Sequence, residues 1–187
     1  TIRYGIELDF LPGREEQLSR IIHNLPLDYV IGSVHFLDDW NFDGDESLYG
    51  KWSNDELYQR YFSLVVEASK SRLFDTLGHL DLIKKFGIYP ETDQTSLFER
   101  TADVIRDSGM VVELNTSGID KPCHEFYPGQ QWLDILFNRG IPITLSSDAH
   151  HPEQIARHYQ QAVAVLKKTG YRQITTFRNR NKIPLPI

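Results

Sequence analysis

Short apolar runs alternate along the chain with longer amphipathic segments, and this alternation predicts the secondary structure. The short runs predict strands, and helix-like spacing of apolar residues fills the intervals between them. The expected strands are 3–9, 29–35, 74–79, 110–115, 142–147 and 173–177, and the expected helices are 14–24, 54–72, 95–108, 129–139 and 153–169. Repeated strand–helix units are typical of parallel α/β proteins. We therefore expect about six β/α units, arranged as an open sheet or an incomplete barrel.

Helix start and stop signals support these segments. Ser53 precedes the helix expected at 54–72, and Pro152 stands where the last helix is expected to begin. Gly109, Gly140 and Gly170 each follow a helical run, where a left-handed residue is favoured.

Polar side chains gather on one face of the expected strands. Successive residues of a strand point to opposite faces, so one face of each strand is apolar and the other becomes polar toward its carboxyl end. The polar positions at these ends are Glu7, His35, His79, Glu113, Asp148 and His150. Because the carboxyl ends of parallel strands meet at one rim, we expect these side chains to converge where active sites of β/α folds lie.

This set of imidazoles and carboxylates favours a metal site. Its nitrogen and oxygen atoms suit zinc, iron or manganese, and it contains no thiolate. Each histidine alone would be interpreted as a packed core residue, and Gly78-His79-Leu80-Asp81 also fits a tight turn with Asp81 as a cap. Five of these residues, Glu7, His35, His79, Asp148 and His150, lie at similar strand ends or turns, and together they indicate a metal site instead.

The loop after His35 contains half of a calcium-binding pattern. Asp39, Asn41, Asp43 and Gly44 fit its first half, but Gly50 stands where the closing glutamate would be needed. We therefore expect a long acidic rim loop, with Trp40 and Phe42 available to pack over a ligand.

Composition narrows the class of protein. The chain has 187 residues, enough for one domain, and a net charge of -6, which argues against a nucleic-acid partner. No apolar run approaches the length of a membrane span, so we expect no membrane partner. The single cysteine, Cys123, cannot form an intrachain disulfide and favours the cytoplasm.

The remaining histidines carry weaker signals. Cys123 and His124 are adjacent in an extended loop and point apart, so we expect no nucleophile–base pair. His23 and His158 lie on expected helices, as surface or packing residues, whereas His151 borders the expected site and is a candidate substrate contact.

Together the motifs resemble the PHP (polymerase and histidinol phosphatase) family, within it the histidinol-phosphatase branch. The segments that carry the resemblance, in family order, are YGIELDF, YVIGSVHFLDDWNFD, LGHLDLIKKFG, VELNTSG and ITLSSDAHHPEQIA. The resemblance implies a distorted barrel of seven β/α units with a trinuclear metal centre. It implies that Glu7 bridges two metals, that His35 and His79 complete one of those sites, and that Asp148 and His150 serve the others.

The chain also departs from the family pattern. It begins at Thr1, without the family's first strand and its His-x-His motif, so we expect a fragment or processed form whose strands 3–9 and 173–177 have unpaired edges. Such an edge implies self-association or retention of the missing N-terminal piece. Asp120 stands where relatives often have a basic residue, and Lys121 and Arg157 are the substitutes we expect to contact phosphate.

The activity implied by the resemblance is metal-dependent hydrolysis of a phosphate monoester, L-histidinol phosphate first. Asp148 or His150 would assist proton transfer, and Glu113 and Asn115 would support the metal ligands or contact the substrate amine. The alternatives are another PHP phosphoesterase, acting on nucleotides or phosphotyrosine, and a non-catalytic PHP-like binding module.

Overall fold

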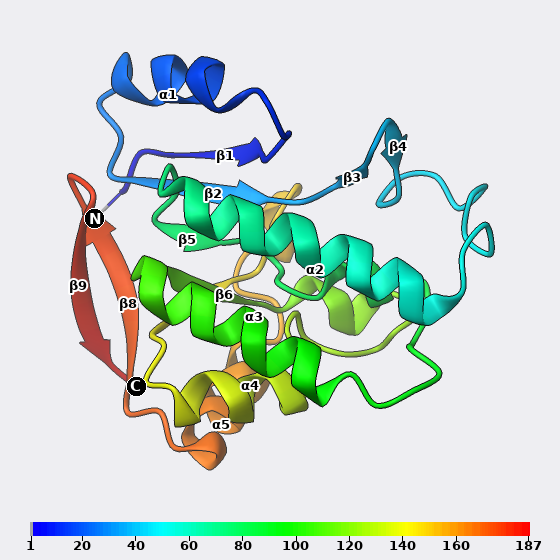
Figure 1. Ribbon diagram of the computed structural model, residues 1–187. Coiled ribbons are helices and arrows are strands. Elements are labelled where there is room, and N and C mark those ends of the chain that lie inside the picture. Colours follow the sequence, from blue (N-terminus) through cyan, green and yellow to red (C-terminus); the bar gives the residue numbers. More distant parts are fainter. Residues whose placement is uncertain (1) are drawn as a thin grey trace.

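The computed structural model describes residues 2–187 and has a five-stranded parallel sheet at its centre. The strand order is β1-β2-β5-β6-β7, and every neighbouring pair is parallel. The strands are β1 (Gly5–Asp9), β2 (Tyr29–Ser33), β5 (Thr76–Leu77), β6 (Val111–Asn115) and β7 (Ile143–Ser146). The expected α/β architecture is confirmed, and the carboxyl ends of the strands point to one side (Figure 1).

Helices cover the outer side of the sheet. They are α1 (Glu15–His23), α2 (Asn54–Ser71), α3 (Thr95–Ser108), α4 (Gln130–Asn138) and α5 (Tyr159–Thr169). From α2 to α5, each helix packs against the next (Figure 1). Within residues 2–187, no helix combines the length and the apolar character needed to cross a membrane.

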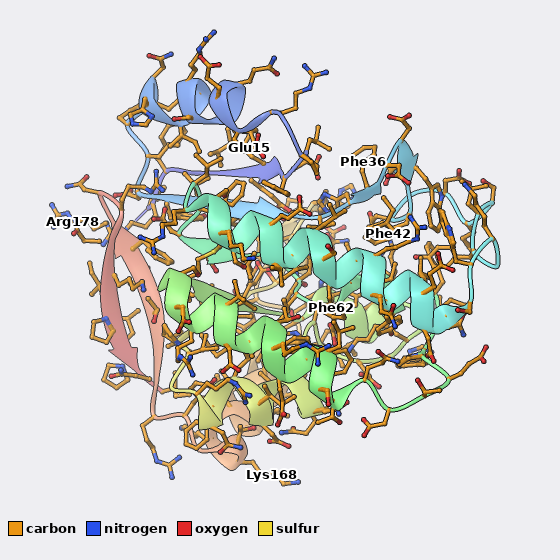
Figure 2. The ribbon with its side chains drawn as sticks, viewed as in Figure 1. Glu15, Phe36, Phe42, Phe62, Lys168 and Arg178 are labelled. Atoms are coloured by element: carbon orange, nitrogen blue, oxygen red, sulfur yellow. The ribbon has the colours of Figure 1, made fainter. Side chains whose placement is uncertain are left out.

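Aromatic side chains join the central helices. Phe62 of α2, labelled in Figure 2, has its ring centroid 5.2 Å from that of Phe98 on α3 and 5.1 Å from that of Trp132 on α4. All three side chains are buried. Each such pair contributes about 0.5–1.5 kcal/mol beyond the burial of its apolar area, so this cluster fixes the positions of the three helices relative to one another.

The loop after β2 forms a small hairpin at the rim, made of β3 (Phe36–Leu37) and β4 (Trp40–Asn41). Trp40 and Phe42 are buried, with 5% and 0% of their surfaces exposed, and Phe42 packs on Tyr61 of α2. The expectation that they cover a ligand was wrong, because their rings anchor the rim loop to the core.

The last helix begins later than the sequence predicted. Residues Pro152–Gln154 form only one 3-10 turn, and α5 starts at Tyr159. Between them, Ala156 and His158 have φ of +60° and +57°, which an α-helix does not allow. The backbone N–H of Ala156 instead donates to Ser147 Oγ, so this segment folds back toward the end of β7.

The sixth expected strand is present but does not extend the parallel sheet. β8 (Gln173–Arg178) pairs antiparallel with β9 (Asn181–Pro186), which the sequence reading missed. The turn residues Asn179 and Arg180 have positive φ, as a two-residue hairpin turn requires. Their backbone N–H groups donate to Asp28, just before β2, so the hairpin reaches across the amino ends of the strands (Figure 1).

Candidate metal centre

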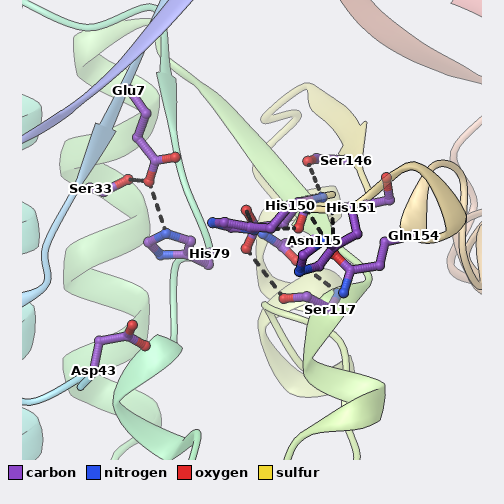
Figure 3. A network of polar contacts seen from close by, with 12 residues as sticks. Glu7, Ser33, Asp43, His79, Asn115, Ser117, Ser146, His150, His151 and Gln154 are labelled. Atoms are coloured by element: carbon purple, nitrogen blue, oxygen red, sulfur yellow. Dashed lines mark hydrogen bonds and ion pairs between the residues drawn. The ribbon is translucent and has the colours of Figure 1, made fainter. Parts of the chain in front are cut away.

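Three predicted ligands meet at the carboxyl ends of β1, β2 and β5. Nε2 of His79 lies 3.1 Å from Oε1 of Glu7 and 3.2 Å from Nε2 of His35. One ligand atom from each residue lies within 4.8 Å of the others, and among residues 2–187 they form the group of three suited to a metal ion. Figure 3 shows Glu7 and His79 joined across the rim.

Local backbone geometry brings His79 close to Glu7. A Cβ atom on Gly78 would lie 2.7 Å from Ser33 Oγ and 3.0 Å from a methyl carbon of Ile31, so this position needs glycine. His79 itself has φ of +25°, an uncommon value for a residue with a side chain. Such strain is typical of functional sites, where the surrounding structure enforces it.

The negative charge of Glu7 and the positive charge of His79 stabilise each other. Burial opposes ionisation of Glu7, but the His79 hydrogen bond and charge, with the Ser33 hydroxyl and His35, lower its pKa to about 2. Burial also disfavours a charged His79, yet the Glu7 hydrogen bond and the carboxylates of Glu7, Glu113 and Asp148 raise its pKa to about 9. Without a metal, the centre is therefore an ion pair at neutral pH.

Glu113 and Asn115 support the three-residue group through hydrogen bonds to the backbone of His79 and to each other. The backbone N–H of His79 donates to Glu113 Oε2 at 2.8 Å, and the Asn115 amide donates to the same oxygen at 3.1 Å. Both side chains are buried, and burial raises the pKa of Glu113. Neither residue lines the cavity next to Glu7, His35 and His79. Their geometry therefore favours support of the metal ligands over contact with a substrate.

Asp148 and His150 follow the end of β7, and Figure 3 shows His150 across from Glu7 and His79. Asp148 has φ of +49°, and its Oδ2 lies 3.5 Å from Ser117 Oγ. Nδ1 of His150 lies 3.1 Å from the carbonyl oxygen of Asp148, and the His150 side chain is 77% exposed. They form the opposite wall of the same site rather than part of the compact group.

A cavity of about 600 Å³ joins the two walls. Lys121 and Arg157, the two basic residues expected to contact phosphate, both line it, as does His151. The Arg157 guanidinium is held by the carbonyl oxygens of Ser147 and Asp148, at 3.1 and 3.4 Å. The cavity therefore brings carboxylate, imidazole and guanidinium groups from distant parts of the chain together.

Several polar partners of the site residues were not predicted from the sequence. Asp9 Oδ1 lies 2.6 Å from Nδ1 of His35, and Ser33 Oγ donates to Glu7 Oε1 at 2.5 Å. Asp9 lies two residues after Glu7 and Ser33 two residues before His35, so strand alternation puts them on the same polar faces as these ligands, and that signal was available. On the rim loop, Asp43 accepts from Lys85 Nζ at 2.6 Å, a pairing between residues 42 apart that no local pattern indicates.

The structure also places the weaker candidates. Cys123 Sγ lies near Gly118 O and the Tyr127 hydroxyl, and His124 faces Ile119 O, so the two do not form a pair. His23 is exposed on α1, and Nε2 of His158 lies 2.9 Å from Asp120.

Asp81 does not cap the turn that follows it. Its Oδ2 instead accepts from the backbone N–H of Gly129 at 2.9 Å and from Lys84 Nζ at 2.8 Å.

Comparison with known families decides the identity of this fold. A family model described as the PHP domain matches residues 1–117. The chain belongs to the PHP domain family. A probable histidinol-phosphatase of Deinococcus radiodurans is 39% identical over 186 residues, which are 98% of this chain and 70% of the relative. The histidinol-phosphatase of Lactococcus lactis is 26% identical over 189 residues, 94% of this chain and 68% of the relative.

Solved structures of PHP relatives share the fold. The crystal structure of histidinol phosphate phosphatase from Lactococcus lactis, complexed with zinc, L-histidinol and phosphate, matches with a TM-score of 0.80 and 22% identity. The match covers 98% of this chain and 72% of that one. A putative histidinol phosphatase from Listeria monocytogenes matches with a TM-score of 0.70 and 22% identity, over 83% of this chain and 66% of that one. The predicted barrel-type α/β fold of the histidinol-phosphatase branch is confirmed.

The residues of this PHP domain fit a transition metal. Two imidazoles and a carboxylate form the mixed nitrogen and oxygen donor set that zinc accepts, and each of the three residues lies in a strand of the central sheet or just after one. Two of the ligand side chains have a polar partner, Asp9 for His35 and Ser33 for Glu7, whereas Glu113 holds the backbone of His79 and leaves its ring Nδ1 without a hydrogen-bond partner. Partners of this kind are typical of metal sites in proteins.

Proposed function

We propose that this PHP domain belongs to a metal-dependent phosphatase that hydrolyses L-histidinol phosphate. The observation that carries the proposal is a single cavity with Glu7, His35 and His79 on one wall and Lys121 and Arg157 among its lining residues. Two relatives that match nearly the whole chain are named a probable histidinol-phosphatase and a histidinol-phosphatase, which supports this substrate.

In this proposal, Glu7, His35 and His79 hold one metal ion, and Asp148 and His150 hold further ions. Zinc is our first choice, with iron or manganese as alternatives that metal analysis of the purified protein distinguishes. When bound, the metal neutralises phosphate oxygens and lowers the pKa of water toward neutrality.

The basic residues bind the phosphate end of the substrate. Arg157 is fixed by two backbone carbonyls and by Asp120, with its Nη1 3.3 Å from Asp120 Oδ2, so the guanidinium is already oriented. Lys121 adds a mobile point charge to the same cavity. Prior orientation of this kind lowers the entropic cost of positioning the phosphorus atom for attack.

Asp148 and His150, on the opposite wall of the cavity, are the residues for proton transfer. Because Nδ1 of His150 donates to the Asp148 carbonyl in the neutral ring, Nε2 keeps its lone pair. We propose that one of the two supplies a proton to the leaving alkoxide: either the Asp148 carboxyl group, through the oxygen that binds no metal, or His150 Nε2, whose lone pair cannot hold a metal at the same time.

Phosphate release from a panel of esters tests the proposal. We expect the zinc-loaded protein to hydrolyse L-histidinol phosphate in preference to a nucleoside monophosphate and phosphotyrosine, and to lose activity after treatment with a chelator. Preference for another ester would overturn the substrate assignment. A protein that retains no metal after gentle purification, and gains no activity with added zinc, would support a non-catalytic binding module.

Two finer proposals concern the setting of the chain. The first is that the reaction takes place in the cytoplasm, where a lone cysteine such as Cys123 remains reduced. Within residues 2–187, β1 pairs only with β2, and we propose that its outer edge pairs with a strand of a second copy or of another segment.

A further inference from the structure

Asp9 and His35 form a short contact beside the metal ligands. Asp9 is the last residue of β1, two positions after Glu7, and His35 follows the end of β2. Parallel pairing sets Asp9 opposite Ser33, so His35 lies just beyond the carboxylate. Asp9 Oδ1 lies 2.6 Å from His35 Nδ1.

This contact fixes which nitrogen of His35 carries the hydrogen. An ionised carboxylate only accepts hydrogen bonds, so the hydrogen lies on Nδ1. In the neutral ring, Nε2 then keeps its lone pair. Nε2 is also the atom that faces the other ligands, 3.2 Å from His79 Nε2 and 3.9 Å from Glu7 Oε1.

We propose that Asp9 is a positioning residue that holds His35 in the tautomer and ring orientation required of a metal ligand. The inference rests on the metal centre of the proposed function. Asp9 acts through His35: its Oδ1 is engaged by the ring, and it lies outside the compact group of three ligands. The His35 side chain is 24% exposed, so without Asp9 the ring can turn toward solvent.

Two variants separate the charge of Asp9 from its hydrogen bond. Asp9→Ala removes both, whereas Asp9→Asn keeps an oxygen that can accept from Nδ1–H. Asp39→Asn is the matched control, because it removes a charge from an exposed residue of the rim loop that does not line the cavity. Urea unfolding of each variant checks that it folds.

The first measurement is zinc affinity by competition with a chromogenic chelator. We expect Asp9→Ala to weaken zinc binding about 10–100-fold, the usual effect of losing a carboxylate behind a ligating histidine. Asp9→Asn should fall between Asp9→Ala and the wild type, and Asp39→Asn should match the wild type. Equal zinc affinity of Asp9→Ala and the wild type would overturn the inference.

The second measurement is the nitrogen NMR spectrum of His35 in the metal-free protein, which reports its tautomer directly. The wild type should show the hydrogen on Nδ1, and Asp9→Ala should show a mixture of both tautomers. An unchanged spectrum contradicts the inference even if Asp9→Ala is otherwise perturbed. If zinc binding depends on Asp9 but no phosphate ester is hydrolysed, the inference stands and the proposed function fails.

Discussion

His79 shows at the scale of one residue how this site is prepared for a cation. Its ring is buried, which disfavours charge, yet the carboxylates of Glu7, Glu113 and Asp148 raise its pKa to about 9. The cluster therefore binds a proton where the proposal places a metal. A metal ion and this proton compete for the same Nε2 atom.

We therefore predict that zinc binding releases a proton from His79. At pH 7, below the pKa of about 9, His79 carries a proton that metal coordination displaces, so about one proton leaves per ion bound. Glu7, with its pKa near 2, is already ionised and contributes none. Apparent zinc affinity should rise with pH up to about 9.

Calorimetry in buffers of different ionisation enthalpy measures this release. The proton count should decline as the pH passes 9, where metal-free His79 becomes neutral. Zinc binding at pH 7 whose heat is independent of the buffer would contradict the assignment of His79 as a ligand.

Single residues also show which structural features a local sequence pattern can predict and which it cannot. Strand alternation placed Asp9 and Ser33 on the polar faces, but their roles depend on neighbours 26 residues away in each case. Asp43 and Lys85 pair over a longer separation without any local signal. A pattern identifies the face of a side chain, whereas its partner depends on strand register.

At the scale of elements, a buried ion pair joins the turn after β5 to the start of α4. Lys84 Nζ lies 2.8 Å from Asp81 Oδ2 and 2.7 Å from Glu125 Oε2, and Asp81 also accepts from Gly129 just before α4. Lys84 and Asp81 are only 3% and 4% exposed. The turn that carries His79 is therefore tied to a helix more than 40 residues away.

We predict that Lys84→Met lowers the free energy of unfolding by about 3–5 kcal/mol, because it leaves Asp81 buried without its cation. Urea unfolding measures the change. Arg106→Met is the control: Arg106 pairs with Asp103 and Asp107 at the surface of α3, and its loss should cost less than about 1 kcal/mol. Similar losses in both variants would contradict the role of the buried pair.

The elements themselves were predicted unevenly, for physical reasons. Helix α2 begins at Asn54 as expected, because the Ser53 hydroxyl accepts from the N–H of Glu56. Helix α5 was predicted too long, because Pro152 and Glu153 begin only a 3-10 turn before the backbone bends toward Ser147. Local start signals mark where a helix is possible, and tertiary hydrogen bonds decide whether it continues.

At the scale of the whole molecule, the two ends of the strand order differ. Beyond β7, the β8–β9 hairpin packs alongside and reaches Asp28. At the other end, within the part of the chain that the structure describes, β1 has a neighbour on one side only. An unpaired strand edge offers backbone donors and acceptors to other strands.

The proposed edge pairing predicts a species larger than a monomer. Light scattering over a dilution series should give more than the 21.7 kDa of one chain, or mass spectrometry should find a co-purifying peptide. A strictly monomeric chain without any bound peptide would contradict the proposal.

The sequence by itself determined the repeated strand–helix order, the polar face of each strand, and Glu7, His35 and His79 as neighbours at one rim. These follow from local alternation and from the direction of parallel strands, which do not depend on distant contacts. Only the tertiary structure decided the pairing of Asp9 with His35, the burial of Trp40 and Phe42, and the antiparallel partner of β8. Each of these depends on register and packing between segments that the chain brings together only when it folds.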